Sequence, residues 1–161
     1  MSFENVILFS NYITNCVIND KNTSFQMVDG IDMSSIIANN IYEVPLFKFI
    51  LGIFKSTIIN DDHYDNIFIY VINYLNYLKT KGVYLNLLTS HRLIYILIIL
   101  ANKISDDDAC DNILWANIAN INISQVNMME YAILQIFNFD LMVVISYEKA
   151  LAIYKTISTK M

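Results

Sequence analysis

Two isolated charges lie in otherwise apolar stretches of this chain, where they could form an ion pair or meet a partner. Lys103 follows a run from Leu93 to Asn102 with no charged side chain, and Glu130 is the only charge between Asp111 and Asp140. A charge among apolar neighbours is costly unless it is paired or hydrogen-bonded. Alternatively, Lys103 extends its ammonium into solvent at a helix end and Glu130 faces water. On the residues alone, this solvent-facing interpretation is the simpler one.

The other polar residues do not form a recognisable catalytic set. His63 and His91 fall on different predicted elements and outside an HExxH spacing, and the phosphate-binding and nucleophile motifs built on glycine are absent. The aspartates at 106–108 lack the Gly and distal Glu of a calcium loop, so we predict a solvated, capping turn. We therefore predict a binding protein that is not an enzyme and needs no metal and no cofactor.

Charge and cysteine content exclude further classes of function. The net charge of -5 and the absence of a basic stripe argue against binding to a phosphate backbone. Cys16 and Cys110 form no CxxC pair, so we predict free, buried thiols in a reducing compartment. The N-terminus lacks the basic region of a secretory signal. The apolar run at 93–101 is shorter than the roughly 20 residues that span a bilayer, so we predict no membrane insertion.

Helical periodicity and the scarcity of breakers predict an all-α protein. The 161 residues include one proline, Pro45, and three glycines, and 56% are hydrophobic, which suffices for one core. We predict that Thr89 or Ser90, Asp106–Asp108 and Ser124 begin or cap helices, and that Gly82 ends one. The predicted helices cover residues 2–17, a short segment from about Asp32, and residues 45–58, 63–81, 90–103, 111–119, about 124–137 and 146–157, with the helix at 90–103 buried on nearly all sides.

The motifs at 90–141 follow one another in an order and spacing typical of one family. The matching residues are His91-Arg92-Leu93, Ala101, Lys103, Asp106-Asp107, Asn112, Ala116, Asn127, Glu130 and Phe139-Asp140-Leu141, with Asn73, Tyr74 and Leu78 upstream. This pattern resembles the cyclin box, and most closely that of the P-type (U-type) cyclins. The chain departs from the pattern where Ala119-Asn120 replaces a glycine pair. An arginine of the first box helix has no secure counterpart.

The resemblance implies a fold and a domain organisation. It implies a single five-helix cyclin box with flanking N-terminal and C-terminal helices. Residues 1–44 would form an N-terminal helical extension and loop, residues 45–141 the box, and residues 142–161 the C-terminal helix. The protein would work inside the cell, in the cytoplasm or nucleus, as a monomer when free and as a heterodimer with a cyclin-dependent kinase.

The resemblance also implies a kinase-binding site. Lys103 and Glu130 would stand together and bond the backbone of the kinase's αC helix and its preceding loop. Leu134 and Leu141 match residues that line an apolar pocket, Phe139 matches their aromatic neighbour, and Ile104 takes a place often held by Phe. Such a protein activates its kinase by favouring the αC-in state. The alternatives are a cyclin-fold, transcription-factor-like protein that contacts DNA and a helical scaffold without kinase activation.

Overall fold

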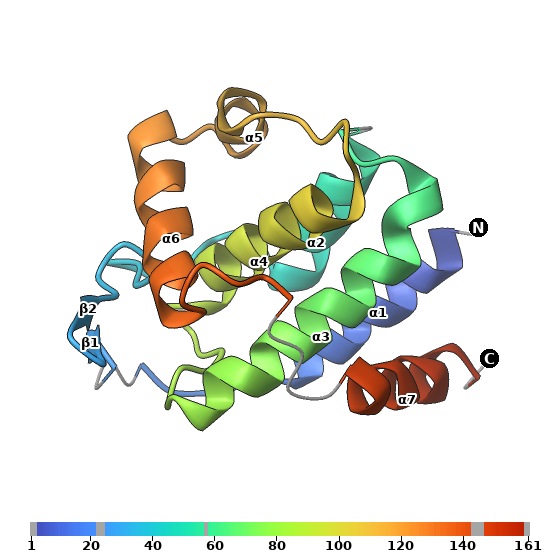
Figure 1. Ribbon diagram of the computed structural model, residues 1–161, viewed down its shortest axis with the longest axis horizontal. Helices are drawn as coiled ribbons and strands as arrows, with labels where there is room; N and C mark the ends of the chain where they lie inside the picture. Colours follow the sequence, from blue (N-terminus) through green and yellow to red (C-terminus); the bar gives the residue numbers. More distant parts are fainter. Residues whose placement is uncertain (1–2, 22–24, 57, 143–146, 160–161) are drawn as a thin grey trace.

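Helices packed around a central one, α4 (Ser90–Ser105), make up the architecture (Figure 1). The structure is a computed structural model that describes residues 3–21, 25–56, 58–142 and 147–159. Its other elements are α1 (Phe3–Asn15), β1 (Met27–Val28), β2 (Ile31–Asp32), α2 (Leu46–Lys55), the 3₁₀ helix η1 (Asp61–His63), α3 (Tyr64–Thr80), α5 (Asn112–Ala119), α6 (Ile123–Ile136) and α7 (Tyr147–Ser158). The all-α prediction is confirmed: five helices, α2 to α6, are flanked by α1 and α7.

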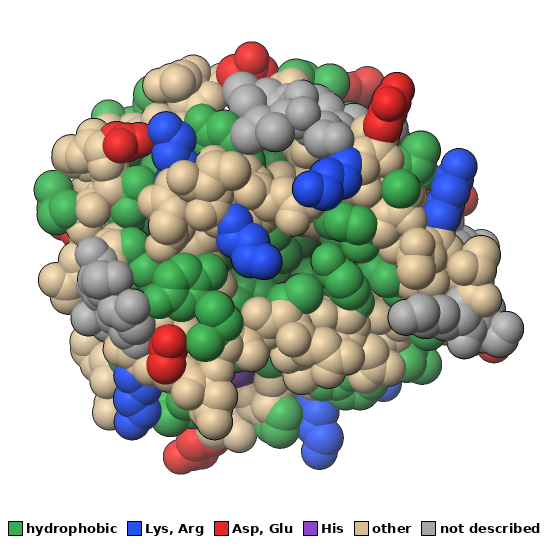
Figure 2. Space-filling view, turned by 90° about the horizontal axis from the view of Figure 1, so that it is seen from below, with side chains coloured by type: hydrophobic (Ala, Val, Ile, Leu, Met, Phe, Trp, Pro, Cys, Tyr) green, Lys and Arg blue, Asp and Glu red, His purple; other side chains and the backbone are tan. Residues whose placement is uncertain are grey.

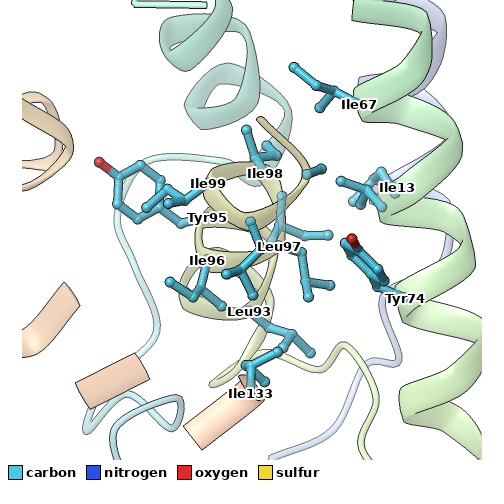
Figure 3. Packing of buried hydrophobic residues seen from close by; sticks show 14 of the residues in the cluster. Ile13, Ile67, Tyr74, Leu93, Tyr95, Ile96, Leu97, Ile98, Ile99 and Ile133 are labelled. Atoms are coloured by element: carbon cyan, nitrogen blue, oxygen red, sulfur yellow. The ribbon is translucent and has the colours of Figure 1, made fainter. Parts of the chain in front are cut away.

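Helix α4 is buried because its apolar side chains point in every direction around its axis. From Leu93 to Ala101 no residue is more than 2% exposed. Figure 3 shows Tyr74 of α3 on one side of α4, whereas Tyr95 points to the opposite side. Burying one such Ile or Leu side chain contributes about 1.5–3 kcal/mol, so this helix supplies much of the core's stability. The prediction of a buried central helix is confirmed.

Helix α7 packs against α1 and α3 (Figure 1). Ala150 and Tyr154 are its buried residues among those described, and the Tyr154 hydroxyl donates to Asp65 of α3. Two neighbouring pockets that share Tyr12 lie on the face made by these helices, a groove with polar and apolar lining, and Figure 2 shows hydrophobic side chains gathered around a hollow on this side of the molecule. Tyr12 lies in this groove, and burial raises the pKa of its hydroxyl to about 12.

Short polar side chains define several helix ends. Gly82 has φ +78° and follows α3, where the Val83 N–H donates to the Leu78 carbonyl at 2.9 Å, so the predicted glycine termination is confirmed. Asp111 caps α5 by accepting from the Leu114 N–H at 3.4 Å. The aspartates at 106–108 therefore do not cap that helix. Asp106 instead accepts from the Asp108 N–H at 2.9 Å, within the turn itself.

Of two further capping predictions, the one for Ser124 is wrong and the one for Thr89 is right in position only. Helix α6 is capped by Asn122, whose side chain accepts from the Ser124 N–H at 2.9 Å, so Ser124 lies inside the first turn. Thr89 does occupy the N-cap position of α4, but its hydroxyl makes no cap bond. It donates to the Tyr84 carbonyl and accepts from the Asn86 N–H, both at 2.9 Å, because the loop before α4 folds back onto it.

The short helix predicted near Asp32 is replaced by a two-stranded hairpin. Strands β1 and β2 pair antiparallel across Asp29 and Gly30, whose φ values of +50° and +79° suit a two-residue hairpin turn. The Asp32 side chain accepts from the Ser34 N–H at 2.9 Å. This bond closes a local turn after β2 and does not start a helix. Aspartate is common both in such turns and at helix starts, so the sequence alone could not distinguish the two.

The prediction of buried thiols is also wrong. Cys16 is exposed and Cys110 is half-buried, and both are free. Cys16 lies just beyond the last residue of α1, where the chain leaves the core. Among the described helices, none combines the length and the apolar character needed to cross a bilayer.

His91 and Arg92 fasten the segment before α2 to the central helix. The His91 ring stacks on Tyr42 with centroids 4.5 Å apart, and its Nε2 donates to the Val44 carbonyl at 2.6 Å. Arg92 donates to the Tyr42 hydroxyl and to the carbonyls of Ser35 and Ile37 at 3.0–3.2 Å. The residues that open the family motif therefore have a structural role in this fold.

Stability should fall as His91 becomes protonated in the unfolded chain. Burial lowers the pKa of His91, an effect partly offset by the bond to Val44, while Tyr42, Phe49 and Arg92 surround it. Below about pH 6.5 the unfolded chain then binds more protons than the folded one, so stability declines by at most about 1.4 kcal/mol per pH unit. Urea unfolding at several pH values should show this decline in the wild type.

The matched variants for this prediction are His91→Gln and His63→Gln. His91→Gln removes the titration and should flatten the decline between about pH 7 and pH 5.5. The His63 side chain is 27% exposed and lies 3.7 Å from Asp106. Its variant shows how much of the pH dependence of the free energy of unfolding comes from the other histidine. Equal pH slopes for the wild type and His91→Gln would contradict the assignment to His91.

Candidate functional site

The two isolated charges meet at the junction of α4 and α6. Lys103 Nζ lies 2.5 Å from Glu130 Oε1, although the residues are 27 positions apart in the chain. Lys103 belongs to the last turn of α4, where a cation is also favoured by the helix dipole. The side chains are 30% and 17% exposed, so this ion pair sits at the surface yet is partly withdrawn from water.

Two asparagines extend the pair into a four-residue polar cluster. Asn112, at the start of α5, accepts from Lys103 Nζ at 2.8 Å and donates to Glu130 Oε2 at 2.7 Å. Its amide nitrogen also lies 2.8 Å from Asn127 Oδ1. We call Lys103, Asn112, Asn127 and Glu130 the polar cluster. Three helices therefore contribute to one hydrogen-bonded network.

The polar cluster retains hydrogen-bonding capacity for a partner. An ammonium has three N–H groups, and among the described residues Lys103 uses two of them, toward Glu130 and Asn112. Each Glu130 oxygen accepts one bond and has room for another. One donor and nearby acceptor sites are thus presented together, which suits the N–H and C=O groups of a partner's backbone.

Large side chains are exposed on α6, next to Glu130 in the sequence, and on the segment that follows this helix. Tyr131 is 58% exposed, Phe139 62% and Met142 53%. The rings of Tyr131 and Phe139 have centroids 6.0 Å apart, which places the segment after α6 against its outer face. Tyr131 and Phe139 thus form an exposed aromatic pair on and just after the helix that carries Glu130, and aromatic residues are enriched at protein–protein interfaces.

The backbone after α6 holds Phe139 in an unfavourable conformation. Asn138 and Phe139 have φ values of +52° and +58°, a region in which a non-glycine residue costs about 1–2 kcal/mol. The Phe139 N–H donates to the Leu134 carbonyl at 2.7 Å, and the Tyr74 hydroxyl donates to the Leu141 carbonyl at 2.9 Å. The turn is thereby tied to α6 and α3 while the Phe139 ring points into solvent.

The structure places the six residues predicted for the site as follows. Lys103 and Glu130 are in direct contact. Leu134 lies one turn after Glu130 on α6 and is joined to Phe139 by the backbone bond. Leu134 and Leu141 are partly buried and pack on the core, and half-buried Ile104 follows Lys103 in α4. Their function in binding stays a prediction.

Sequence reasoning assigned no function to Asn112, Asn127 or Tyr131. The N-x-x-E spacing did contain a signal for Asn127, because residues three apart on a helix share a face. Asn112 could not be identified in this way, since its contacts depend on where α5 begins. Within the described residues, no three His, Cys, Asp or Glu side chains are grouped so that they could hold a metal ion.

Comparison with known proteins identifies the family of this chain. A search of curated proteins gave no match. The family model for Cyclin matches residues 20–141. The match includes α2 to α6 and every residue of the polar cluster, and it begins upstream of Pro45, where the box boundary remains a prediction. Because this match covers well over half of the sequence, the chain belongs to the cyclin family.

Proposed function

We propose that this chain binds a cyclin-dependent kinase and activates it. Members of the cyclin family are regulatory and not catalytic, and they act on a protein partner that is typically a kinase. The observation that carries the proposal is the contact between Lys103 and Glu130, which is largely withdrawn from water although it lies at the surface. The docking surface comprises Lys103, Ile104, Glu130, Leu134, Phe139 and Leu141.

The polar cluster would bind main-chain groups of the kinase. The remaining Lys103 N–H would donate to a backbone carbonyl, and Glu130 would accept from backbone N–H groups, of the kinase's αC helix and its preceding loop. These bonds are charge-assisted, which makes them stronger than bonds between neutral groups. Phe139, Leu134 and Leu141 would receive an apolar side chain and exclude water around the bonds.

Activation follows from preferential binding to one kinase conformation. A protein kinase needs an ion pair between a lysine of its third strand and a glutamate of its αC helix before ATP is correctly held. A cyclin that binds only the αC-in arrangement shifts the kinase population toward it, by no more than its differential affinity for the two states. The kinase keeps the catalytic groups, and this chain supplies binding energy.

We also propose that the chain is a P-type cyclin that works inside the cell as one half of a heterodimer. The motifs from His91 to Leu141 support this subclass. The acidic net charge of -5 favours a protein partner over DNA.

The test is a binding and turnover experiment with purified components. Cyclin-dependent kinases from the source organism would be titrated with this chain, and the dissociation constant and kinase turnover measured. We expect a saturable complex with turnover raised by more than tenfold. Binding without activation would support a scaffold, and steeply salt-dependent binding to DNA would support the transcription-factor-like alternative. Either result, or no kinase binding, would overturn the proposal.

Phe139→Gly should change stability and kinase binding in opposite directions. Glycine adopts the observed positive φ without strain, so the free energy of unfolding should rise by about 0.5–1 kcal/mol. The same change deletes a side chain that is 62% exposed, so the kinase's dissociation constant should increase at least tenfold. Urea unfolding and titration calorimetry would measure the two effects.

Asn138→Gly is the matched control, because Asn138 has a similar φ of +52° and precedes Phe139. It should also stabilise the free protein but leave kinase affinity unchanged. Weaker binding by both variants to the same extent would show that the backbone turn, and not the Phe139 ring, is what the kinase recognises.

A further inference from the structure

The amide of Asn112 can adopt only one orientation within the polar cluster. An ammonium only donates hydrogen bonds and a carboxylate only accepts them. The amide oxygen therefore faces Lys103 Nζ at 2.8 Å, and the amide nitrogen faces Glu130 Oε2 at 2.7 Å. In a flipped amide, the NH2 group would face the Lys103 ammonium, so two donors would meet, and the oxygen would face the Glu130 carboxylate, so two acceptors would meet. Asn127 Oδ1, at 2.8 Å from the amide nitrogen, favours the same orientation.

The backbone of Asn112 is held in place by the N-cap of α5 and by a buried residue one turn later. Asp111 caps α5 immediately before it, and Trp115, one turn later, is fully buried. The Trp115 ring lies edge-on to Tyr95 of α4 with centroids 5.9 Å apart, and the Tyr95 hydroxyl donates to the Trp115 carbonyl. Asn112 is therefore a rigid contact point between the end of α4 and the middle of α6.

We propose that Asn112 is a positioning residue that holds Lys103 and Glu130 in their binding geometry before the kinase arrives. This inference rests on the proposed function and adds a specific determinant of its affinity. A lysine and a glutamate each have several rotatable bonds, and fixing them only on binding would cost conformational entropy. Because Asn112 fixes both in the free protein, the kinase meets a preformed pair. Asn112 acts through the pair and need not touch the kinase.

Asn112→Asp tests the proposal with a side chain of almost unchanged size. The aspartate can still accept from Lys103, and the Asn127 amide can turn over to donate to it, but its second oxygen would face Glu130 Oε2, which only accepts. An acidic residue in the first turn favours the helix, so α5 should stay folded. We expect the kinase's dissociation constant to increase at least tenfold, while turnover at saturating concentrations of the variant stays that of the wild-type complex.

A second substitution should restore the polar cluster in the Asn112→Asp background. In Asn112→Asp/Glu130→Gln, the glutamine amide can donate to the new aspartate oxygen, and the cluster again has one negative charge. Because Glu130 itself contacts the kinase in the proposed function, this rescue is measured on the free protein by urea unfolding. The double variant should recover the free energy of unfolding that Asn112→Asp loses. Asn117→Asp, at an exposed position of the same helix, adds the same charge away from the cluster and should bind the kinase like the wild type. A double variant no more stable than Asn112→Asp would overturn the positioning role.

A measurement on the free protein separates this inference from the proposed function. In a ¹⁵N–¹H spectrum, the side-chain amide protons of Asn112 should exchange slowly with water and shift when Glu130 is replaced by Gln. Fast-exchanging Asn112 amide protons would overturn the positioning role even if the kinase binds. If the wild type binds the kinase and Asn112→Asp binds it equally well, only the positioning role fails. If the wild type binds no kinase, the proposed function fails and this inference fails with it.

Discussion

Lys103→Ala and Glu130→Ala should each abolish kinase activation while leaving the helical content unchanged. Removing one member of a desolvated ion pair leaves the other stranded at the interface, at a typical cost of roughly 3–5 kcal/mol. That cost corresponds to roughly a hundredfold or greater loss of affinity. Because both side chains lie at the surface of the free protein, the fold itself should tolerate the change. Titration calorimetry, a kinase assay and far-UV circular dichroism would measure these effects.

Glu148→Ala and Lys155→Ala on α7 are matched controls for the two charge deletions. Both residues are exposed, and α7 packs on α1 and α3, away from the α4–α6 junction (Figure 1). Neither change should alter kinase affinity. Normal activation by Lys103→Ala or Glu130→Ala would show that the site assignment is wrong.

Exchanging the two charges separates a partner contact from an internal ion pair. In Lys103→Glu/Glu130→Lys, the pair can form again, and the Asn112 amide can turn over to match the reversed donor and acceptor. The stability of the free protein should therefore return to within about 1 kcal/mol of the wild-type value, because a glutamate in the last turn of α4 opposes the helix dipole. Kinase affinity should stay low, because the donor and acceptor offered to the kinase backbone have changed places. Full activation by the exchanged variant would indicate that the pair serves only the fold.

Helical periodicity identified most helices of this chain, because a helix that packs on the core must carry apolar residues at helical spacing. The burial of α4 follows from a run that is apolar on all sides, and α3 buries Ile67, Val71, Tyr74 and Leu78 at helical spacing. Which of two neighbouring candidate residues caps a helix could not be predicted when both have the same N-cap preference. Asn122 and Ser124 are both good N-caps, and only the tertiary position of α6 decides between them.

The candidate site was only partly predictable for a related reason. Family resemblance aligned Lys103 with Glu130, and the contact between them is observed. Exposed and buried aromatic residues look alike in a sequence that is 56% hydrophobic, so nothing marked Tyr131 as a surface residue. Whether an aromatic side chain points inward depends on the direction in which the chain leaves α6, which short-range patterns do not determine.

Asparagine is a poor helix former, yet its abundance here fits the fold. Asn60 and Asn122 cap helices through their side-chain oxygens, and Asn120 and Asn138 take positive φ values of +52° just after α5 and α6. These are positions that asparagine tolerates better than most residues. Asn112 then uses both ends of its amide within the polar cluster. The residue that weakens helix prediction thus helps to set where helices end and how they meet.

Trp115→Ala should cause the largest loss of stability among changes in α5, and it should also weaken kinase binding. Trp115 is fully buried and packs edge-on against Tyr95, so its truncation should lower the free energy of unfolding by about 3–5 kcal/mol. The short helix would then be held mainly by α6, and Asn112 at its start would lose its fixed position. Urea unfolding and hydrogen exchange of the α5 amides would measure the two consequences.

The exposed neighbours on the same helix provide the comparison. Ile113 and Leu114 are 54% and 48% exposed, so replacing either by Ala should change stability by less than about 0.5 kcal/mol and leave α5 protected. If Trp115→Ala lowers stability but α5 remains protected and kinase affinity is unchanged, Asn112 does not depend on this anchor. If the α5 amides lose their protection from hydrogen exchange and kinase affinity falls as well, the geometry of the Lys103–Glu130 pair depends on Trp115. That result would explain how a buried tryptophan supports a polar contact on the outside of the protein.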